Sequence, residues 1–208
     1  MTQHFEFLVE DQSMEVFLRG LLPRLLPPNV TFKIHSFQGK HHLLKRLEQR
    51  LRGYATWLPP NWRLMVIVDR DHDDCQELKS RLEQIAANAG IRTRSRPPIC
   101  WQLVNRIAIE ELEAWYFGEW DAVRCAFPGV GKNVPRQKRF RNPDAITDTW
   151  EAFERILQRY GYFKGGLPKI RVAKKIGQHF DPTRCRSQSF ICFHNALKDA
   201  LQKSKDCM

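Results

Sequence analysis

The most apolar stretch of the chain is residues 64–68, LMVIV, with polar residues on both sides. Such a run predicts a strand buried on both faces, which is typical of the middle of a parallel sheet. The run ends at Asp69, the first of four aspartates that fall within residues 69–74. In open parallel sheets the ligand site lies just beyond the carboxyl ends of the strands. The hydrophobic pattern therefore places an acidic loop where we expect a functional site.

Further strands and helices alternate along the first half of the chain. Strands are predicted at His4–Val9, at Val30–Phe37 as a half-exposed edge strand, and around Ile99–Val104. Helices are predicted from an N-cap at Ser13 to Pro23 or to Pro27-Pro28, and over Lys40–Tyr54, Cys75–Ala89 and Arg106–Phe117. This order predicts an α/β fold, in which crossover helices flank a mostly parallel, four-stranded sheet.

The remainder of the chain has no strand pattern. Residues 128–143 are rich in Pro, Gly and basic residues, which indicates a linker or a mobile basic loop. Three helices are predicted beyond it, at residues 144–160, 167–180 and 190–203. We therefore expect an α/β domain over residues 1–127, and a basic loop with a helical region packed on that domain over residues 128–208.

The amino-acid composition disfavours several classes of protein. No segment approaches the ~20 apolar residues that span a bilayer, and the first ten residues do not resemble a signal peptide, so we expect a cytoplasmic protein without membrane contact. The six cysteines form no C-x-x-C pair, which disfavours structural zinc. The 34 basic and 23 acidic residues give a formal charge of +11, which favours polyanionic partners.

Carboxylates follow three of the predicted strands. Asp69 and Asp71 stand two apart at one strand end, Glu10 ends another, and Glu110 and Glu113 would share a face of the helix after the fourth. Mg²⁺ and Mn²⁺ prefer such hard oxygen ligands, usually a few carboxylates with water and a substrate phosphate. These residues therefore predict a divalent-metal site.

The aspartates of the loop have two readings. Asp73 or Asp74 precedes the helix that begins at Cys75, so either is expected to cap its free N–H groups. One cap needs one acid, however, and four acids in six residues repel one another unless a cation offsets the charge. We therefore favour caps for Asp73 and Asp74, and metal ligands for Asp69 and Asp71.

The pattern of a glutamate after one strand and D-x-D after another resembles the TOPRIM domain of topoisomerases, bacterial primases and the overcoming-lysogenization-defect nucleases. The segments FLVEDQSMEVFL, VIVDRDHDDC and AIEELEAWYFGEW resemble more specifically a family of small TOPRIM-like bacterial proteins thought to be encoded beside an ATPase. The TOPRIM pattern covers about residues 4–120, and the family likeness continues weakly into GGLPK and SQSF. Asp11 departs from the glycine common after the glutamate.

The resemblance implies roles for individual residues. Glu10 would bind metal or act as a general acid or base, Asp69 and Asp71 would bind metal, and one of Glu110, Glu111 and Glu113 would be a further ligand. His72-Asp73-Asp74 replaces the usual small residue after D-x-D, so Asp73 is either part of a second metal site or a cap. The implied cofactor is Mg²⁺ or Mn²⁺.

Basic residues could meet the phosphates of a nucleic acid. Lys169, beside the GGLPK turn, is the candidate for contact with the reacting phosphate. Candidates for nonspecific phosphate contacts are Lys132, Arg136, Lys138, Arg139, Arg141, Arg171, Lys174 and Lys175. The alternative for all of them is a solvated basic surface.

These observations predict a metal-dependent TOPRIM nuclease that cleaves DNA or RNA, as the effector of an antiviral defence system with an ATPase partner. Two alternatives remain open at this point. One is a non-catalytic metal-binding or regulatory subunit of an ATPase, and the other is a phosphoryl-transfer enzyme that acts on nucleotides.

Overall fold

Four parallel strands form the centre of the molecule. The computed structural model describes residues 3–95 and 100–203. The strands are β1 (His4–Val9), β2 (Thr31–Ser36), β3 (Trp62–Asp69) and β4 (Leu103–Ala108). They pair in the order β2-β1-β3-β4, and every pair is parallel. The predicted α/β class, the four-stranded sheet and the edge position of β2 are confirmed.

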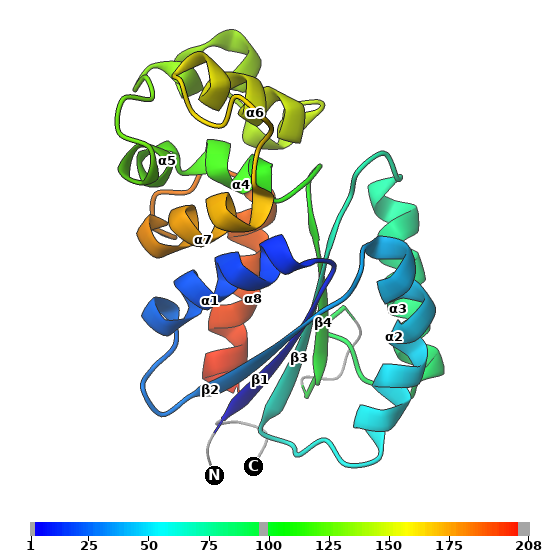
Figure 1. Cartoon of the computed structure of the whole chain (residues 1–208). Helices are drawn as coiled ribbons and strands as arrows, with labels where there is room; N and C mark the ends of the chain where they lie inside the picture. Colours follow the sequence, from blue (N-terminus) through cyan, green and yellow to red (C-terminus); the bar gives the residue numbers. More distant parts are fainter. Residues whose placement is uncertain (1–2, 96–99, 204–208) are drawn as a thin grey trace.

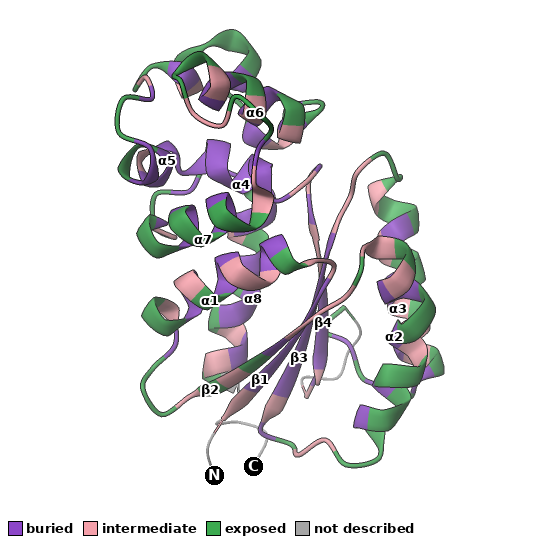
Figure 2. Ribbon diagram, viewed as in Figure 1, coloured by how far each residue is buried: buried purple, intermediate pink, exposed green. Residues whose placement is uncertain are grey.

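Helices cover both faces of this sheet. The helices α2 (Lys40–Ala55) and α3 (Cys75–Asn88) lie on one face, and α1 (Gln12–Leu25) and α8 (Gln188–Lys203) lie on the other (Figure 1). Side chains alternate along β3: Val66 and Val68 pack among the residues of α2 and α3, whereas Met65 and Ile67 join the cluster on the α1 side. The strands β1, β3 and β4 are therefore largely buried, whereas the edge strand β2 and the outer faces of the helices are partly exposed (Figure 2).

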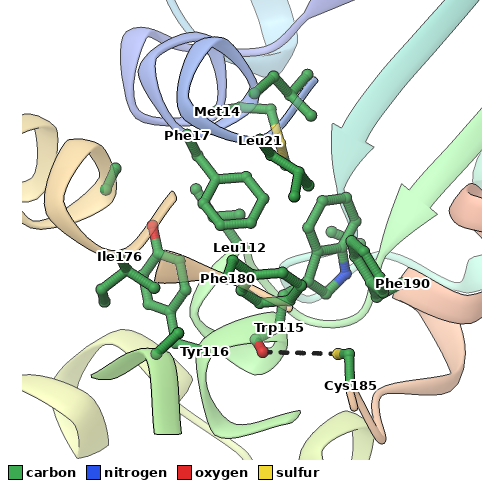
Figure 3. Close-up of a cluster of buried hydrophobic side chains, with 14 of the residues drawn as sticks. Met14, Phe17, Leu21, Leu112, Trp115, Tyr116, Ile176, Phe180, Cys185 and Phe190 are labelled. Carbon is green, nitrogen blue, oxygen red and sulfur yellow. Dashed lines mark hydrogen bonds between the residues drawn. The ribbon is translucent and has the colours of Figure 1, made fainter. Parts of the chain in front are cut away.

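The remaining helices gather near the end of the sheet where the strands finish, on the α1 side (Figure 1). They are α4 (Glu113–Gly118), α5 (Trp120–Ala126), α6 (Thr149–Arg159) and α7 (Lys169–His179). Aromatic residues join them to the sheet: Phe17 of α1 packs 5.8 Å from Trp115 of α4 and 5.1 Å from Phe180, between ring centroids. Figure 3 shows this cluster, in which side chains of α1, α4 and α7 meet.

The helices α1 and α7 cross at unusually short range. A Cβ atom on Gly177 would lie 2.6 Å from the backbone oxygen of Phe17, and one on Gly20 would lie 2.9 Å from the backbone carbon of Gly177. Only glycine permits this approach, because real Cβ atoms essentially never come so near a backbone atom. The crossing fixes α7, and with it Lys169 at its first turn, against the sheet domain.

The fourth strand and the helix after it differ from the prediction. The strand β4 lies at Leu103–Ala108 rather than around Ile99–Val104, and Ile99 itself falls outside the described residues. Its polar residues find distant partners: Asn105 donates to Oε1 of Glu83 (2.9 Å), and Arg106 donates to the carbonyl of Cys192 in α8 (3.1 Å). Because residues 103–108 are strand, the helix predicted at Arg106–Phe117 is wrong over residues 106–112, and the helix α4 begins only at Glu113.

The first helix also starts differently. Asp11, not Ser13, is the N-cap of α1, since its Oδ1 accepts a hydrogen bond from the amide of Met14 (2.9 Å). Ser13 lies buried in the first turn, and Pro23 is inside the helix. By contrast, Asp74 caps α3 as predicted, because its Oδ1 accepts from the amides of Gln76 and Glu77 (2.9 Å each).

The basic segment at residues 128–143, predicted as a linker or a basic loop, has structure of its own. Its residues, with Asp144 and Ala145, form three short 3-10 helices: Val134–Arg136, Lys138–Phe140 and Pro143–Ala145. Val134 and Phe140 are buried, and the Phe140 ring stacks 5.0 Å from that of Phe117. The domain boundary after residue 127 stays a prediction. Among the described helices, none has the length and apolar character needed to cross a membrane.

Candidate functional site

Three carboxylates that influence one another electrostatically lie where the strands finish. The strands β1 and β4 both pair with β3, so the residues that follow the three strands emerge at one edge of the sheet. Glu10 follows β1, Asp69 ends β3, and Glu113 begins the helix after β4. The backbone N–H of Asp69 donates to Oε2 of Glu10 (3.0 Å), which joins the first two directly.

Asp69 is the most unusual of these groups. Its Oδ1 atom is buried and has no hydrogen-bond partner among the described residues. Burial, followed by the nearby charges of Glu10 and Glu113, raises the pKa of the Asp69 carboxyl well above its usual range. Burying an acceptor without a donor costs free energy of folding. A bound cation or a proton on this oxygen would offset that cost.

Glu10 and Glu113 are perturbed in the same direction. Burial raises the pKa of Glu10 to about 7, although the hydrogen bond from the Asp69 amide acts against this shift. Burial also raises the pKa of Glu113 to about 7, against the positive charge of Lys169. Carboxylates crowded into a low-dielectric site resist ionisation together, so near neutral pH the cluster holds protons that a divalent cation would displace.

Lys40, the first residue of α2 after the end of β2, holds the acidic loop at residues 69–74. The Nζ atom of Lys40 lies 2.7 Å from Oδ2 of Asp71 and 2.8 Å from Oδ2 of Asp73, and it donates to the carbonyl of Arg70 (2.9 Å). Asp73 is therefore an ion-pair partner and not a helix cap. Asp71 has φ = 49°, a left-handed conformation that turns the chain sharply after the strand. Sequence reasoning missed Lys40, although it follows the carboxyl end of β2.

Glu110 and Glu111 make other contacts. Oε1 of Glu110 pairs with Arg70 (2.7 Å), and Oε2 accepts from the amide of Asp148 (3.0 Å). Oε2 of Glu111 accepts from Thr149 Oγ1 (3.0 Å) and from the amide of Trp150 (2.9 Å) at the start of α6. Both residues precede α4, so the expected helical face shared by Glu110 and Glu113 does not exist. Of the three glutamates, Glu113 is the one whose charge acts on Asp69.

Tyr116 is a second group that the sequence did not reveal. Its ring packs in the core beside α1 and α7 (Figure 3). Its hydroxyl, however, is buried without a hydrogen-bond partner in the described part of the chain. Burial, with the charges of Glu113, Asp11 and Asp69, raises the pKa of this phenol well above its usual range. The hydroxyl therefore keeps its proton as a donor in the field of the carboxylates.

Lys169 stands beside the carboxylates, as the first residue of α7. Its Nζ lies 4.1 Å from the centroid of the Trp150 ring and 4.0 Å from Oε1 of Glu111. The positive charge of Lys169 also acts on the carboxyl of Glu113, whose pKa it lowers. Lys169 thus brings a cation to the rim of the cluster, on a helix that the glycine crossing holds in place.

The other predicted basic residues lie on the surface. All eight are exposed: Lys132, Arg136, Lys138, Arg139, Arg141, Arg171, Lys174 and Lys175. Two of them, Lys132 and Arg136, line a surface pocket together with Arg184 and Arg186, which sequence reasoning had not singled out. Exposed cations of this kind can contact phosphates without reading sequence.

The chain is similar to a known family in sequence and to a solved structure in fold. Over residues 9–198 its sequence matches the profile of a family described as "Domain of unknown function (DUF4276)". The chain belongs to the DUF4276 family. A search of curated protein sequences gave no match.

The fold of this DUF4276 protein is similar to a solved structure, the C-terminal region of the Burkholderia pseudomallei OLD protein. The sequences are 14% identical, the TM-score is 0.50, and the match covers 99% of this chain and 98% of the other. The predicted resemblance to the overcoming-lysogenization-defect proteins and the TOPRIM-like fold are thereby confirmed. At this identity the similarity establishes the fold alone.

The donor set suits a hard divalent cation. Within residues 3–95 and 100–203, no three His, Cys, Asp or Glu side chains stand ready in a metal-ligand arrangement. Mg²⁺, however, usually takes only one or two carboxylates and keeps several waters or substrate oxygens. Asp69 offers a buried oxygen without a partner, and Glu10 lies against its backbone. The chemistry of these groups therefore fits the metal that a TOPRIM-like fold implies.

Proposed function

We propose that this DUF4276 protein is a divalent-metal-dependent nuclease of the TOPRIM type, which cleaves phosphodiesters of DNA or RNA. The observation that carries the proposal is Oδ1 of Asp69, a buried acceptor without a partner among the described residues, in the field of Glu10 and Glu113 at the carboxyl edge of the sheet. If Asp69 had only a structural role, nothing would offset the free-energy cost of burying this acceptor without a hydrogen bond.

The proposed cofactor is Mg²⁺ or Mn²⁺. Asp69, Glu10 and Glu113 would hold it, together with Asp71 if that carboxylate leaves Lys40. Asp73, which also pairs with Lys40, would take part only in a second metal site. When bound, the metal supplies positive charge that stabilises the charge developing on the phosphate oxygens. Glu110 is excluded from this set because Arg70 and the Asp148 amide already occupy its two oxygens.

The side chains of the protein would provide the rest of the chemistry. If Asp69 and Glu113 hold the metal, Glu10, whose Oε2 accepts a hydrogen bond from the Asp69 amide, would instead take a proton from an attacking water. Lys169 would contact the scissile phosphate, since its ammonium group stands at the rim of the cluster. The Tyr116 hydroxyl would donate a hydrogen bond within the site.

The charge of the chain supports a nucleic-acid substrate. The formal charge is +11, and the eight exposed basic residues lie on α7 and on residues 128–143. Such a surface binds polyanions through counterion release, so binding should weaken steeply as salt is raised. We further propose that the protein is the effector of an ATPase-paired defence system. The similar solved structure is only a C-terminal region of its protein, which is consistent with a partner working beside this chain.

The test is a cleavage assay with the full chain on single-stranded DNA, double-stranded DNA and RNA, in EDTA, Mg²⁺ or Mn²⁺. We expect cleavage only with metal, and its loss in Asp69→Asn. The matched control is Glu151→Gln, which neutralises an exposed carboxylate on α6. Intact nucleic acid under every condition, with an ATPase partner also present, would contradict the proposal.

The same assay separates the two alternatives. Metal binding in calorimetry without turnover would favour a non-catalytic metal-binding subunit of an ATPase. Turnover of small nucleotides without cleavage of polymers would favour a phosphoryl-transfer enzyme that acts on nucleotides.

A further inference from the structure

A second polar site lies at the opposite end of the strands from the carboxylate cluster. It is a cavity of about 530 Å³ formed by the starts of β1 and β3, by β2 and by the last turns of α2. Its volume is within the range of small-molecule sites. Along β1, His4 in this cavity and Glu10 in the cluster are about 20 Å apart, at roughly 3.3 Å per residue. The cavity is therefore a separate site.

Aromatic rings form one wall of the cavity. The Trp57 and Trp62 rings lie 5.4 Å apart at 83°, and Tyr54 lies 5.4 Å from Trp57. The ring of His4 lies 4.1 Å from that of Trp62. Trp57 is 53% exposed, although tryptophan is a residue that folding normally covers. An exposed indole face beside further rings is the surface on which planar heteroaromatic ligands stack.

A buried carboxylate organises the polar wall. Glu6 is only 5% exposed, and its Oε2 accepts a hydrogen bond from the Tyr54 hydroxyl (3.0 Å) and contacts Nε2 of His35 (2.6 Å). Arg50 lies 3.0 Å from Nδ1 of His35. Since a guanidinium only donates, Nδ1 accepts and Nε2 carries the proton given to Glu6. This chain of hydrogen bonds holds the Arg50 guanidinium at the cavity.

The cavity can still bind more polar groups. Among the described residues, Oε1 of Glu6 has one hydrogen-bond contact, with Nε2 of His4 at 3.3 Å, so it retains capacity to accept a hydrogen bond from an amino group. Lys33 of β2 adds a second cation to the lining beside Arg50. The site thus combines a flat aromatic face, a hydrogen-bond acceptor and two cations.

We propose that this cavity binds a nucleotide, with the base against Trp57 and the phosphate against Arg50 and Lys33. A simple anion would leave the aromatic wall unused, and an apolar ligand would leave the cations and Glu6 unused. The same chemistry belongs to a free nucleotide and to one nucleotide of a single strand, and the experiment distinguishes them. The proposal does not depend on nuclease activity.

The experiment is isothermal titration of the full chain, in EDTA so that cleavage does not interfere, with adenosine monophosphate and with a short single-stranded oligodeoxyadenylate. We expect saturable binding that weakens about ten-fold or more in Trp57→Ala and in Arg50→Ala, because stacking and charge contacts are each lost. Trp57→Phe should retain most of the affinity. The matched control is Arg52→Ala on the same helix, where Arg52 pairs with Glu48 outside the cavity and binding should change less than about two-fold.

The outcomes separate the sources of the nucleotide. Equal affinity for both ligands indicates that the cavity binds a free nucleotide. If the oligonucleotide binds more tightly, and Trp57→Ala abolishes that additional affinity, the cavity binds one nucleotide of a strand. The proposal is overturned if neither ligand binds saturably, if Trp57→Ala binds like the parent protein, or if inorganic phosphate binds as tightly as adenosine monophosphate. Circular dichroism of each variant shows whether it is folded, and Trp57 and Arg50 are exposed positions where substitution leaves the core intact.

Discussion

The backbone amide of Asp69 donates a hydrogen bond of 3.0 Å to Oε2 of Glu10, which ties the ends of two neighbouring strands together at the carboxylate cluster. This bond favours the ionised form of Glu10, yet burial outweighs it and the pKa of Glu10 still rises to about 7. The strands therefore hold acids in an arrangement that is unfavourable for the metal-free protein. Strain of this kind is typical of functional sites.

The first prediction concerns the stability of the metal-free protein as pH changes. The pKa of Glu113 rises from 4.5 to about 7 on folding, so the folded state binds more protons than the unfolded state between these values. The free energy of unfolding should therefore fall as pH rises from about 4.5 to 7, by on the order of 3 kcal/mol for this group. Urea unfolding in EDTA at several pH values measures the slope.

Variants identify the source of this slope. Glu113→Gln and Glu10→Gln should each flatten the fall in stability, whereas Glu151→Gln, at an exposed position of α6, should leave it unchanged. Added Mg²⁺ should displace the protons and reduce the slope in the parent protein. A stability that rises over the same pH range would contradict the assignment.

The second prediction is that Asp69→Asn separates function from stability. Burial beside Glu10 and Glu113 disfavours the charged form of Asp69, and asparagine removes this carboxyl, so the metal-free variant should be at least as stable as the parent protein. It should also lose cleavage and lose the rise in melting temperature that Mn²⁺ gives the parent protein. Melting curves in EDTA and in Mn²⁺ measure both effects. A strongly destabilised variant would instead indicate a structural role for Asp69.

Much of the fold follows from the sequence because local pattern and tertiary structure agree. The apolar run before Asp69 and the strict alternation of β2 each report the burial that the sheet imposes. The bounds of β4 could not be predicted, because Asn105 and Arg106 interrupt its apolar pattern. Their polar groups are satisfied by Glu83 and by the carbonyl of Cys192, contacts that no local pattern contains.

The candidate site could likewise be predicted only in part. Glu10 and Asp69 could be found because acids that follow adjacent parallel strands must meet at one edge. Lys40 was missed because it stands at a helix start among other basic residues, and Tyr116 because an aromatic residue in an apolar segment reads as packing. Only the folded structure shows that the Tyr116 hydroxyl is buried, has no partner within residues 3–95 and 100–203, and lies in the field of acids.

The third prediction tests Lys40 as a counter-ion of the acidic loop. Lys40→Gln leaves Asp71 and Asp73 without the ammonium group that lies 2.7 and 2.8 Å from them. We expect a loss of about 1 kcal/mol in the free energy of unfolding, since both carboxylates are partly exposed and the solvent screens their charge. Mg²⁺ should restore part of the loss, because a cation can replace the lysine. Chemical unfolding with and without Mg²⁺ gives both values, and an unchanged stability in EDTA would refute this role.

The fourth prediction distinguishes Glu110 from Glu113. Glu110→Ala removes the partner of Arg70 and of the Asp148 amide in a buried position, and should cost roughly 3 kcal/mol of stability. The variant should still show a Mn²⁺-dependent rise in melting temperature, because Glu110 holds no metal. Glu113→Gln should do the reverse, keeping its stability and losing the response to Mn²⁺. A Glu110→Ala variant that stays stable but loses the metal response would instead make Glu110 a ligand.

The fifth prediction concerns the helix crossing that carries Lys169. Gly177→Ala places a Cβ atom 2.6 Å from the backbone oxygen of Phe17, so α7 must shift, at a cost of about 1–3 kcal/mol. Gly53→Ala on α2 is the matched control, because nothing lies within 4 Å of its new Cβ and alanine favours helix, for a gain of about 0.5–1 kcal/mol. Urea unfolding measures both changes. Since α7 positions Lys169, Gly177→Ala should also slow cleavage. The rate is measured under conditions where the variant is fully folded, so that its lower stability does not account for the change. Equal cleavage by the two variants would show that the position of α7 does not matter for the reaction.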